Sequence, residues 1–89
     1  MNAVITVVGK DAVGILAKTA VICASHNANI VDVSQTVLGD IFSMVMLADI
    51  SKLSGELSSL SSELSKMGKE SGLVIYCMHE DIFNSMHRI

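Results

Sequence analysis

This 89-residue sequence has no proline, no tryptophan, one tyrosine, two phenylalanines and only six lysines and arginines. Its net charge is −3, and the few basic residues form no cluster, so the chain lacks the positive surface that nucleic-acid binding requires. A sheet that stacks bases would also need more aromatic side chains. No apolar run approaches the roughly 18 residues of a membrane span. The sequence therefore predicts neither a nucleic-acid partner nor a membrane partner.

Cysteine is also scarce, and its spacing is uninformative for metal or redox chemistry. Cys23 and Cys77 lie within apolar runs and form no CxxC motif. We expect buried free thiols, which are inert rather than catalytic and suit a reducing cytoplasm. Met1 is followed at once by a strand pattern, without the basic and apolar regions of a signal peptide. These features favour a cytoplasmic protein.

The hydrophobic content is high for so short a chain. Hydrophobic residues make up 51% of the sequence, yet a chain of this size buries only about 60% of the surface that it exposes when unfolded. We expect a single domain over residues 1–89 with apolar surface left over after folding. A homodimer or a higher homo-oligomer is the simplest way to cover that surface.

Hydrophobic periodicity predicts the element order βαββαβ, followed by a tail. Strands are expected at residues 2–8, 30–38, 41–49 and 73–78, and helices at residues 12–26 and 51–69. Gly39-Asp40 separates two strand patterns and indicates a hairpin. The tail, residues 79–89, places Ile82, Phe83, Met86 and Ile89 at helical spacing. It is therefore expected to form a short amphipathic helix.

The polarity of each strand predicts its place in the sheet. The strand at 30–38 alternates, with Val31, Val33 and Val37 on one face and Asp32, Ser34 and Thr36 on the other. One polar face suits an edge strand. The strands at 2–8 and 41–49 are apolar on both faces and are expected to be central.

Each helix has a predicted apolar stripe. In the first helix, the residues of the stripe are Val13, Leu16, Ala17, Ala20, Val21 and Ala24. In the second, they are Leu53, Leu57, Leu60, Leu64 and Met67. Ser51 is the expected N-cap of the second helix. At the end of the first helix, Asn27 or Asn29 is expected to take the left-handed conformation.

These elements predict an α+β, ferredoxin-like sandwich with the antiparallel sheet order 4-1-3-2. Both helices then lie on one face of the sheet. The other face still carries apolar side chains and needs a cover. A partner subunit and the C-terminal tail are the two candidates.

The turn after the first strand, Gly9–Ile15, is the main candidate site. Gly9 is expected to end the strand through backbone angles closed to other residues, and Asp11 is expected to be the N-cap of the helix. Gly14 falls near the third helical position, where the lack of a side chain permits close approach of a strand or a ligand. Free N–H groups at a helix start attract anions. On spacing alone, the pattern favours a well-capped turn that binds nothing, because a short glycine-rich turn is a weak motif.

The sequence resembles an ACT domain, in particular the short stand-alone ACT proteins of the UPF0237 type. The resemblance rests on residues 5–16, on residues 29–35 leading into the hairpin, and on the tail at 79–89. It implies a non-enzymatic regulatory module. It also implies pairing through the second strand and the first helix into a continuous eight-stranded sheet, with an amino acid bound at that interface.

The resemblance further implies a set of ligand-binding residues. They are Gly9, Lys10, Asp11, Val13, Gly14 and Ile15 of one chain, with Asn29 and Ile30 of its neighbour. Asp11 either caps the helix or holds the ligand amine. Most ACT domains regulate a catalytic or DNA-binding domain on their own chain, and this sequence has none. Any output is expected to pass through a separate, unknown partner protein.

Two other functions are compatible with the sequence. The chain is either a structural or interaction module without a small ligand, or a metal-binding oligomer that uses His79 and His87 of the tail. Those two histidines lack the i, i+4 spacing of a helical metal site, so no metal or other cofactor is predicted. No nucleophile has a recognisable partner, and the glycines match neither a P-loop nor a dinucleotide fingerprint. The sequence therefore predicts that the protein is not an enzyme.

Overall fold

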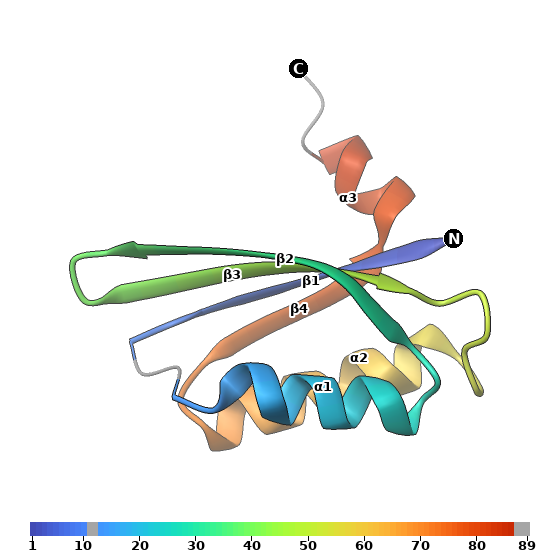
Figure 1. The fold of residues 1–89 in the computed structure, drawn as a ribbon, viewed down its shortest axis with the longest axis horizontal. Helices are drawn as coiled ribbons and strands as arrows, with labels where there is room; N and C mark the ends of the chain where they lie inside the picture. Colours follow the sequence, from blue (N-terminus) through green and yellow to red (C-terminus); the bar gives the residue numbers. More distant parts are fainter. Residues whose placement is uncertain (11–12, 87–89) are drawn as a thin grey trace.

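The computed structural model describes residues 1–10 and 13–86. In chain order its elements are β1 (Asn2–Gly9), α1 (Ile15–Ser25), β2 (Asn29–Leu38), β3 (Ile41–Asp49), α2 (Leu57–Glu70), β4 (Val74–His79) and α3 (Glu80–Met86). The strands form one antiparallel sheet in the order β2-β3-β1-β4. Helices α1 and α2 cover one face, and α3 stands on the other (Figure 1). The predicted α+β, ferredoxin-like fold and its sheet order are confirmed.

The core lies between the sheet and the two long helices. Alternate residues of the central strands point into it, and Ile5, Val7, Met44 and Met46 are fully buried. α2 contributes Leu60 and Leu64, while Leu57 and Met67 pack at its margin. The predicted stripe of α2 is therefore the buried one. β1 and β3 occupy the centre of the sheet, as their two apolar faces predicted.

β2 is an edge strand, as predicted, but its alternation is interrupted. The pairing with β3 shifts between Ile30 and Asp32, which leaves Val31 as the extra residue of a β-bulge. Ile30 and Val33 consequently pack on the core, and Val31 is exposed. The prediction that Val31 shares the buried face with Val33 was wrong, because a bulge reverses the alternation on one side of it.

α1 differs most from its predicted form. It begins at Ile15 rather than at residue 12, and its buried residues are Ile15, Thr19 and Cys23. The six residues of its predicted stripe are all exposed, Val13 at 91% and Val21 at 69%. Because α1 is apolar on nearly all sides, its periodicity did not indicate which side faces the sheet. Asn27 has φ 60°, which confirms the predicted left-handed residue after this helix.

α2 begins six residues later than predicted. Residues 50–55 form a hydrogen-bonded turn in which the N–H of Ser51 donates to Asp49 Oδ1 and the N–H of Ser54 donates to the carbonyl of His26. Gly55, with φ 77°, then redirects the chain. Glu56, not Ser51, is the N-cap of α2. The serine instead belongs to the turn that joins β3 to the helix.

The face of the sheet turned away from α1 and α2, here called the open face, is only partly covered. α3 stands on one end of it and points away from the sheet (Figure 1); at that end Val4 is 6% exposed and Phe83 is half-buried. Ile82 and Met86 of α3 remain exposed, and Ile89 lies outside the described residues. Within the described part of the chain, no helix is long and apolar enough to cross a bilayer.

Candidate functional site

Gly9 ends β1 against the loop before β4. A Cβ added at Gly9 would lie 2.0 Å from Cδ2 of Leu73, which is buried. Its φ is not in the left-handed region, since only Gly14, Gly39, Gly55 and Gly72 among the described glycines have positive φ. Gly9 is therefore required for close approach, not for the backbone freedom that the sequence analysis assigned to it.

Gly14 is required for its backbone conformation and not for close approach. It is the N-cap of α1 and has φ 74°, while a Cβ placed on it would meet no atom within 4 Å. It is therefore not a third-position helical residue pressed against a neighbour, as predicted, but a left-handed residue at the helix start. Asp11, the predicted N-cap, lies outside the described residues, and Gly14 occupies the N-cap position.

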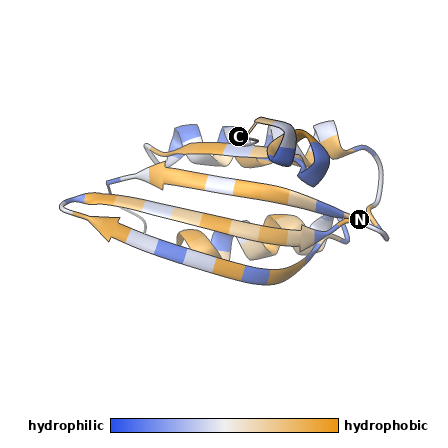
Figure 2. Cartoon of the chain, turned by 90° about the horizontal axis from the view of Figure 1, so that it is seen from above, coloured by the Kyte–Doolittle hydropathy of each residue, from blue (hydrophilic) through white to orange (hydrophobic). Residues whose placement is uncertain are grey.

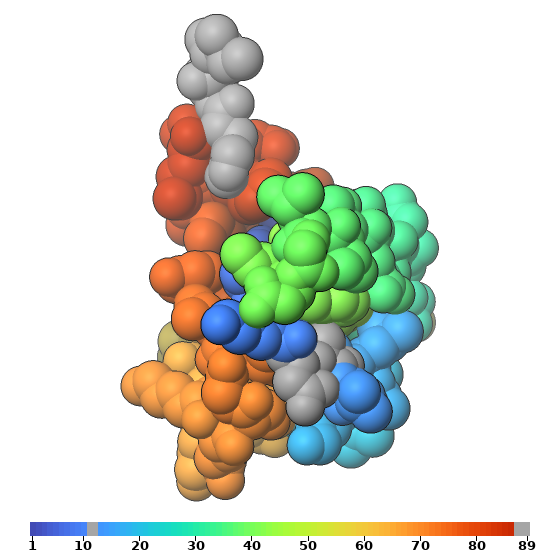
Figure 3. All heavy atoms as spheres, turned by 90° about the vertical axis from the view of Figure 1, so that its left-hand side faces the viewer, coloured from blue at the N-terminus to red at the C-terminus, as the bar shows by residue number. Residues whose placement is uncertain are grey.

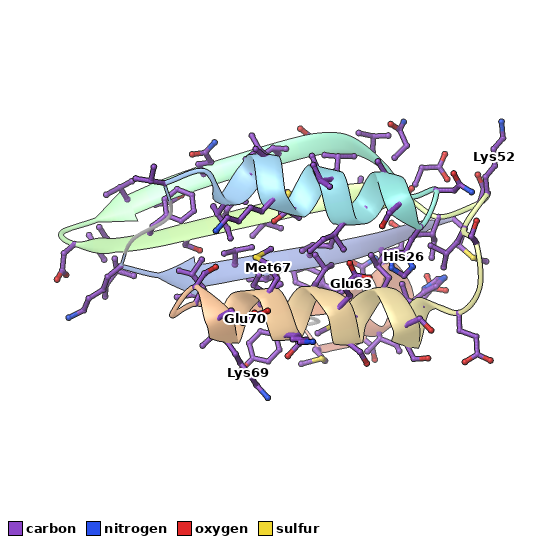
Figure 4. All side chains as sticks on the ribbon, turned by 90° about the horizontal axis from the view of Figure 1, so that it is seen from below. His26, Lys52, Glu63, Met67, Lys69 and Glu70 are labelled. Carbon is purple, nitrogen blue, oxygen red and sulfur yellow. The ribbon has the colours of Figure 1, made fainter. Side chains whose placement is uncertain are left out.

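A small pocket of about 190 Å³ lies beside this helix start. It is lined by Val13, Ile15, Lys18, Glu70, Ser71 and Leu73. Ile15 and Leu73 are buried and give it an apolar floor, whereas Lys18 and Glu70 are exposed at its rim. Figure 3 looks onto this end of the molecule, and Figure 4 shows Glu70 on the last turn of α2. Both helices therefore contribute to the pocket.

The ends of the two helices give the pocket opposite polarity on its two sides. The N–H of Lys18 donates to the carbonyl of Gly14, so the first-turn N–H groups before it have no partner within the helix and favour an anion. Glu70 and Ser71 stand at the C-terminal end of α2, which favours a cation. In the described structure neither Lys18 nor Glu70 forms an ion pair.

The second part of the predicted site lies at the other end of the sheet. Gly9 pairs with Phe42 of β3, and Asn29 pairs with Asp49. Those two β3 residues are seven positions apart, or about 24 Å at 3.4 Å per residue. One chain thus does not bring Asn29 and Ile30 to the turn at Gly9–Ile15.

Comparison with known proteins identifies the family. Residues 2–78 match the family described as "ACT domain". The chain belongs to the ACT domain family. This ACT domain is 51% identical to a UPF0237 protein of Methanococcus maripaludis, over 99% of this chain and 98% of that protein. It is 49% identical to a UPF0237 protein of Clostridium perfringens over the full length of both.

A solved structure agrees with this assignment. The ACT domain protein from Streptococcus pneumoniae is 36% identical and superimposes with a TM-score of 0.79, over 93% of each chain. The resemblance inferred from the sequence, to short ACT proteins of the UPF0237 type, is therefore confirmed. ACT domains are regulatory domains that bind small ligands.

The residues that the family resemblance indicated are not all free in this ACT domain. Nζ of Lys10 lies 3.7 Å from Oδ2 of Asp40 in the β2–β3 turn. Both side chains are well exposed, so this pair contributes little stability. The pair joins the β2–β3 turn to the end of β1.

Sequence reasoning missed Lys18, Glu70, Ser71 and Leu73 as site residues. The charge of Lys18 is a weak signal, since it is the only charged side chain between residues 13 and 25. Glu70 had no signal of its own, because it closes a helix rich in serine, glutamate and lysine. It reaches the pocket only because β4 returns antiparallel to β1 and carries the end of α2 beside the start of α1.

The histidines of this ACT domain have structural partners. Nε2 of His26, the C-cap of α1, lies 2.9 Å from Oε1 of Glu63 on α2 (Figure 4). Nδ1 of His79 accepts the N–H of Asp81, and His87 lies outside the described residues. Across residues 1–10 and 13–86, no group of three His, Cys, Asp or Glu side chains is arranged to hold a metal ion.

The two thiols are free and protected from ionisation. Cys23 is buried, and burial raises its pKa. Burial, together with the nearby Cys23, raises the pKa of Cys77 to about 11. A thiol with so high a pKa is a poor nucleophile at neutral pH. Neither cysteine is therefore placed for catalysis.

Stability is expected to fall in alkaline solution because of Cys77. The folded state favours the neutral thiol, whereas the unfolded thiol ionises near its ordinary pKa of 9.0. This contribution to the free energy of unfolding is full below pH 9 and is lost as the pH rises through about 11. Urea titrations between pH 7 and pH 10.5 should show a smaller decrease for Cys77→Ala than for the wild type. Equal decreases would contradict the expectation.

Proposed function

We propose that this ACT domain is a non-enzymatic sensor of an amino acid and acts as a homodimer on a separate partner protein. The main support for this proposal is the pocket between the start of α1 and the end of α2. It offers Lys18 on one side, Glu70 on the other and an apolar floor of Ile15 and Leu73. A free amino acid has a carboxylate, an ammonium group and a side chain, which match these three features.

The pocket size limits the ligand. About 190 Å³ accommodates a single small or medium amino acid rather than a nucleotide or a drug-sized molecule. Lys18 and the first-turn N–H groups of α1 hold the carboxylate. Glu70 and the C-terminal end of α2 hold the ammonium group. On the exposed side of the pocket, a second chain contributes its Asn29 and Ile30.

Pairing through β2 and α1 supports this arrangement. β2 is a ten-residue edge strand without lysine or proline, and its regular part beyond the bulge at Val31, residues 32–38, is open to strand pairing. The exposed apolar side of α1 needs a cover as well. When two β2 strands pair antiparallel, Asn29 and Ile30 of one chain come to the Leu38 end of the other, beside its β1–α1 turn. The separation of about 24 Å within one chain is then bridged by the partner.

The sensing mechanism follows from linkage. A ligand held between two chains binds the paired state more tightly than the single chain, so it shifts the population toward the pair. The surface of the pair then differs from that of the single chain. A partner protein that recognises only the pair receives the signal without any domain on the same chain.

A thermal-shift screen against the twenty amino acids tests this proposal. An amino acid at 100 times its Kd should add about 2.7 kcal/mol of stability and raise Tm by roughly 14 °C. Lys18→Met and Glu70→Gln should each weaken binding about 10- to 100-fold, since each removes a charge-assisted hydrogen bond. Lys66→Met and Glu56→Gln are matched controls, because both lie on the surface outside the pocket.

Three results would count against the proposal. A flat screen would contradict amino-acid sensing by this chain. Binding that survives both pocket substitutions would move the ligand to another site. Binding with unchanged affinity in a variant that stays monomeric would contradict the role of the second chain.

A further inference from the structure

β4 is the second edge of the sheet, opposite β2. Among the described strands it pairs with β1 alone, and that pairing has no bulge. β4 also contains neither lysine nor proline. Lysine, proline and bulges are the devices with which natural proteins close a sheet edge, so the outward N–H and C=O groups of β4 are open to another strand. Figure 2 shows β4 along one edge of the sheet, with turns of α2 beyond it.

A groove of about 370 Å³ lies between α2 and this edge, and we call it the β4 groove. The strand lines it from Val74 to Met78. The helix lines it with a row of residues four positions apart, which are Ser61, Ser65 and Lys69. A Cβ added at Gly68 would lie 2.8 Å from Cγ1 of Ile75, so helix and strand are packed directly against each other at one end of the groove.

The side chains of β4 alternate between the two faces of the sheet. Ile75 and Cys77 pack on the core, beneath the helices. Val74 and Tyr76 point to the open face and are 51% and 57% exposed. A strand added beside β4 alternates in the same way. Every second side chain of such a strand packs on Val74 and Tyr76, and the others face the row on α2.

The charge of the β4 groove is positive at one end. Lys69 is the one charged side chain among the described residues that line it, and it points away from α1 (Figure 4). The nearest carboxylates of α2 line other parts of the surface, because Glu70 lies at the pocket beside α1 and Glu63 lies next to His26. Glu80 follows β4 at the far end and lines the pocket beside α3. The groove therefore favours an acidic group at its Lys69 end.

We propose that the β4 groove binds an extended segment of a partner protein, which adds a strand to the sheet at β4. β4 has six residues, so the segment pairs over about 20 Å at 3.4 Å per residue. Its apolar side chains pack on Val74 and Tyr76, and an acidic side chain on its other face pairs with Lys69. Addition of a strand to an exposed sheet edge is a recurring mode of peptide recognition.

A second copy of this chain fits the edge less well than a single segment. Pairing of two β4 strands would bring the α2 of the second copy against the row of Ser61, Ser65 and Lys69. Helices pack through apolar side chains, and this row has none. A single extended segment is one strand wide and needs no contact between helices.

The segment belongs to the separate partner protein of the proposed function, on which this inference rests to that extent. The β4 groove and the amino-acid pocket share only Leu73 among their lining residues. Peptide binding is therefore measured without an amino acid, and the amino-acid screen without a peptide. Either can fail while the other succeeds.

A selection of random peptides of about ten residues on the immobilised full chain tests the groove. The selected peptides should alternate apolar residues with others and carry a glutamate or an aspartate. Lys69→Glu should weaken their binding about tenfold or more, and a lysine in place of the acidic residue of the peptide should restore binding to that variant. Lys52→Glu makes the same change of charge outside the groove and should leave the affinity unchanged. A selection without binders, or binders insensitive to Lys69→Glu, would overturn the proposal.

N-methylation of a selected peptide tests the pairing with β4 without any change to the protein. Consecutive residues of a strand point their N–H groups to opposite edges. Methyl groups on alternate nitrogens should therefore abolish binding in one register and leave it nearly unchanged in the other. Equal losses in both registers would overturn strand addition.

Hydrogen exchange of the full chain locates the added strand. The outward-facing amides of β4 should exchange freely in the unbound protein and become protected when the peptide binds. Protection that appears along β2 instead would overturn the proposal. Protection of the same β4 amides without peptide, together with a doubled mass in analytical ultracentrifugation, would assign the edge to a second copy and overturn it as well.

Discussion

Leu64→Ala is expected to lower the free energy of unfolding by about 3 kcal/mol and Tm by roughly 15 °C. Leu64 is fully buried in the core between α2 and the sheet. Five of the 14 residues of α2 are serine, so the helix has weak intrinsic propensity and depends on its packed side. Removing one of its two fully buried leucines leaves a cavity and weakens the contact that holds the helix. Urea titration followed by circular dichroism measures the change.

The control is Ser62→Ala on the exposed side of the same helix. It should leave stability unchanged or raise it slightly, since alanine is the better helix former. A domain of this kind has only about 5–15 kcal/mol of stability, so the loss at Leu64 is large in proportion. A loss below about 1 kcal/mol would show that the packing of α2 does not determine the stability of the fold.

Gly9→Ala is expected to destabilise the protein by about 1–3 kcal/mol, as overpacked core substitutions do. The added methyl group would lie 2.0 Å from Cδ2 of Leu73, so the leucine or the end of β1 has to move. Leu73 also lines the pocket at the start of α1. The substitution should therefore weaken amino-acid binding along with stability. Both effects are measurable in one thermal-shift series with and without ligand.

A double-mutant cycle with Leu73→Ala identifies the cause. If the clash with Leu73 is responsible, Gly9→Ala should cost almost nothing when residue 73 is alanine. Gly14→Ala provides the contrast, because its cost of about 1–2 kcal/mol comes from φ 74° and not from a neighbour. Leu73→Ala should not relieve it. Equal costs for Gly9→Ala in both backgrounds would contradict the steric explanation.

The sequence predicted the strands well because period-two patterns and the Gly39-Asp40 turn determine them locally. β3 has the predicted bounds, and the other three strands agree within one residue at each end. The helices were predicted less well at their starts. Ser51 has the residue type of an N-cap, but hydrogen bonds from the turn at 50–55 and the left-handed Gly55 delay α2 to Leu57. Those contacts join segments that are distant in sequence.

The candidate site was only half predictable. The turn at Gly9–Ile15 was identified from its glycines and its place between strand and helix, although the physical roles of Gly9 and Gly14 proved to be exchanged. A glycine is equally compatible with close approach and with positive φ, and only the surrounding atoms distinguish the two. Lys18 and Glu70 are 52 positions apart in the sequence, and no local pattern connects them.

By itself, the sequence determined the fold class, the strand order and the excess of apolar surface. These follow from composition and from periodicities that act over a few residues. The tertiary structure alone decided which side of α1 faces the sheet, where α3 stops covering the open face, and that the end of α2 meets the start of α1. Each of these depends on the packing of segments far apart in the chain. An apolar residue is equally suited to a core and to an interface, so its type does not say which one it occupies.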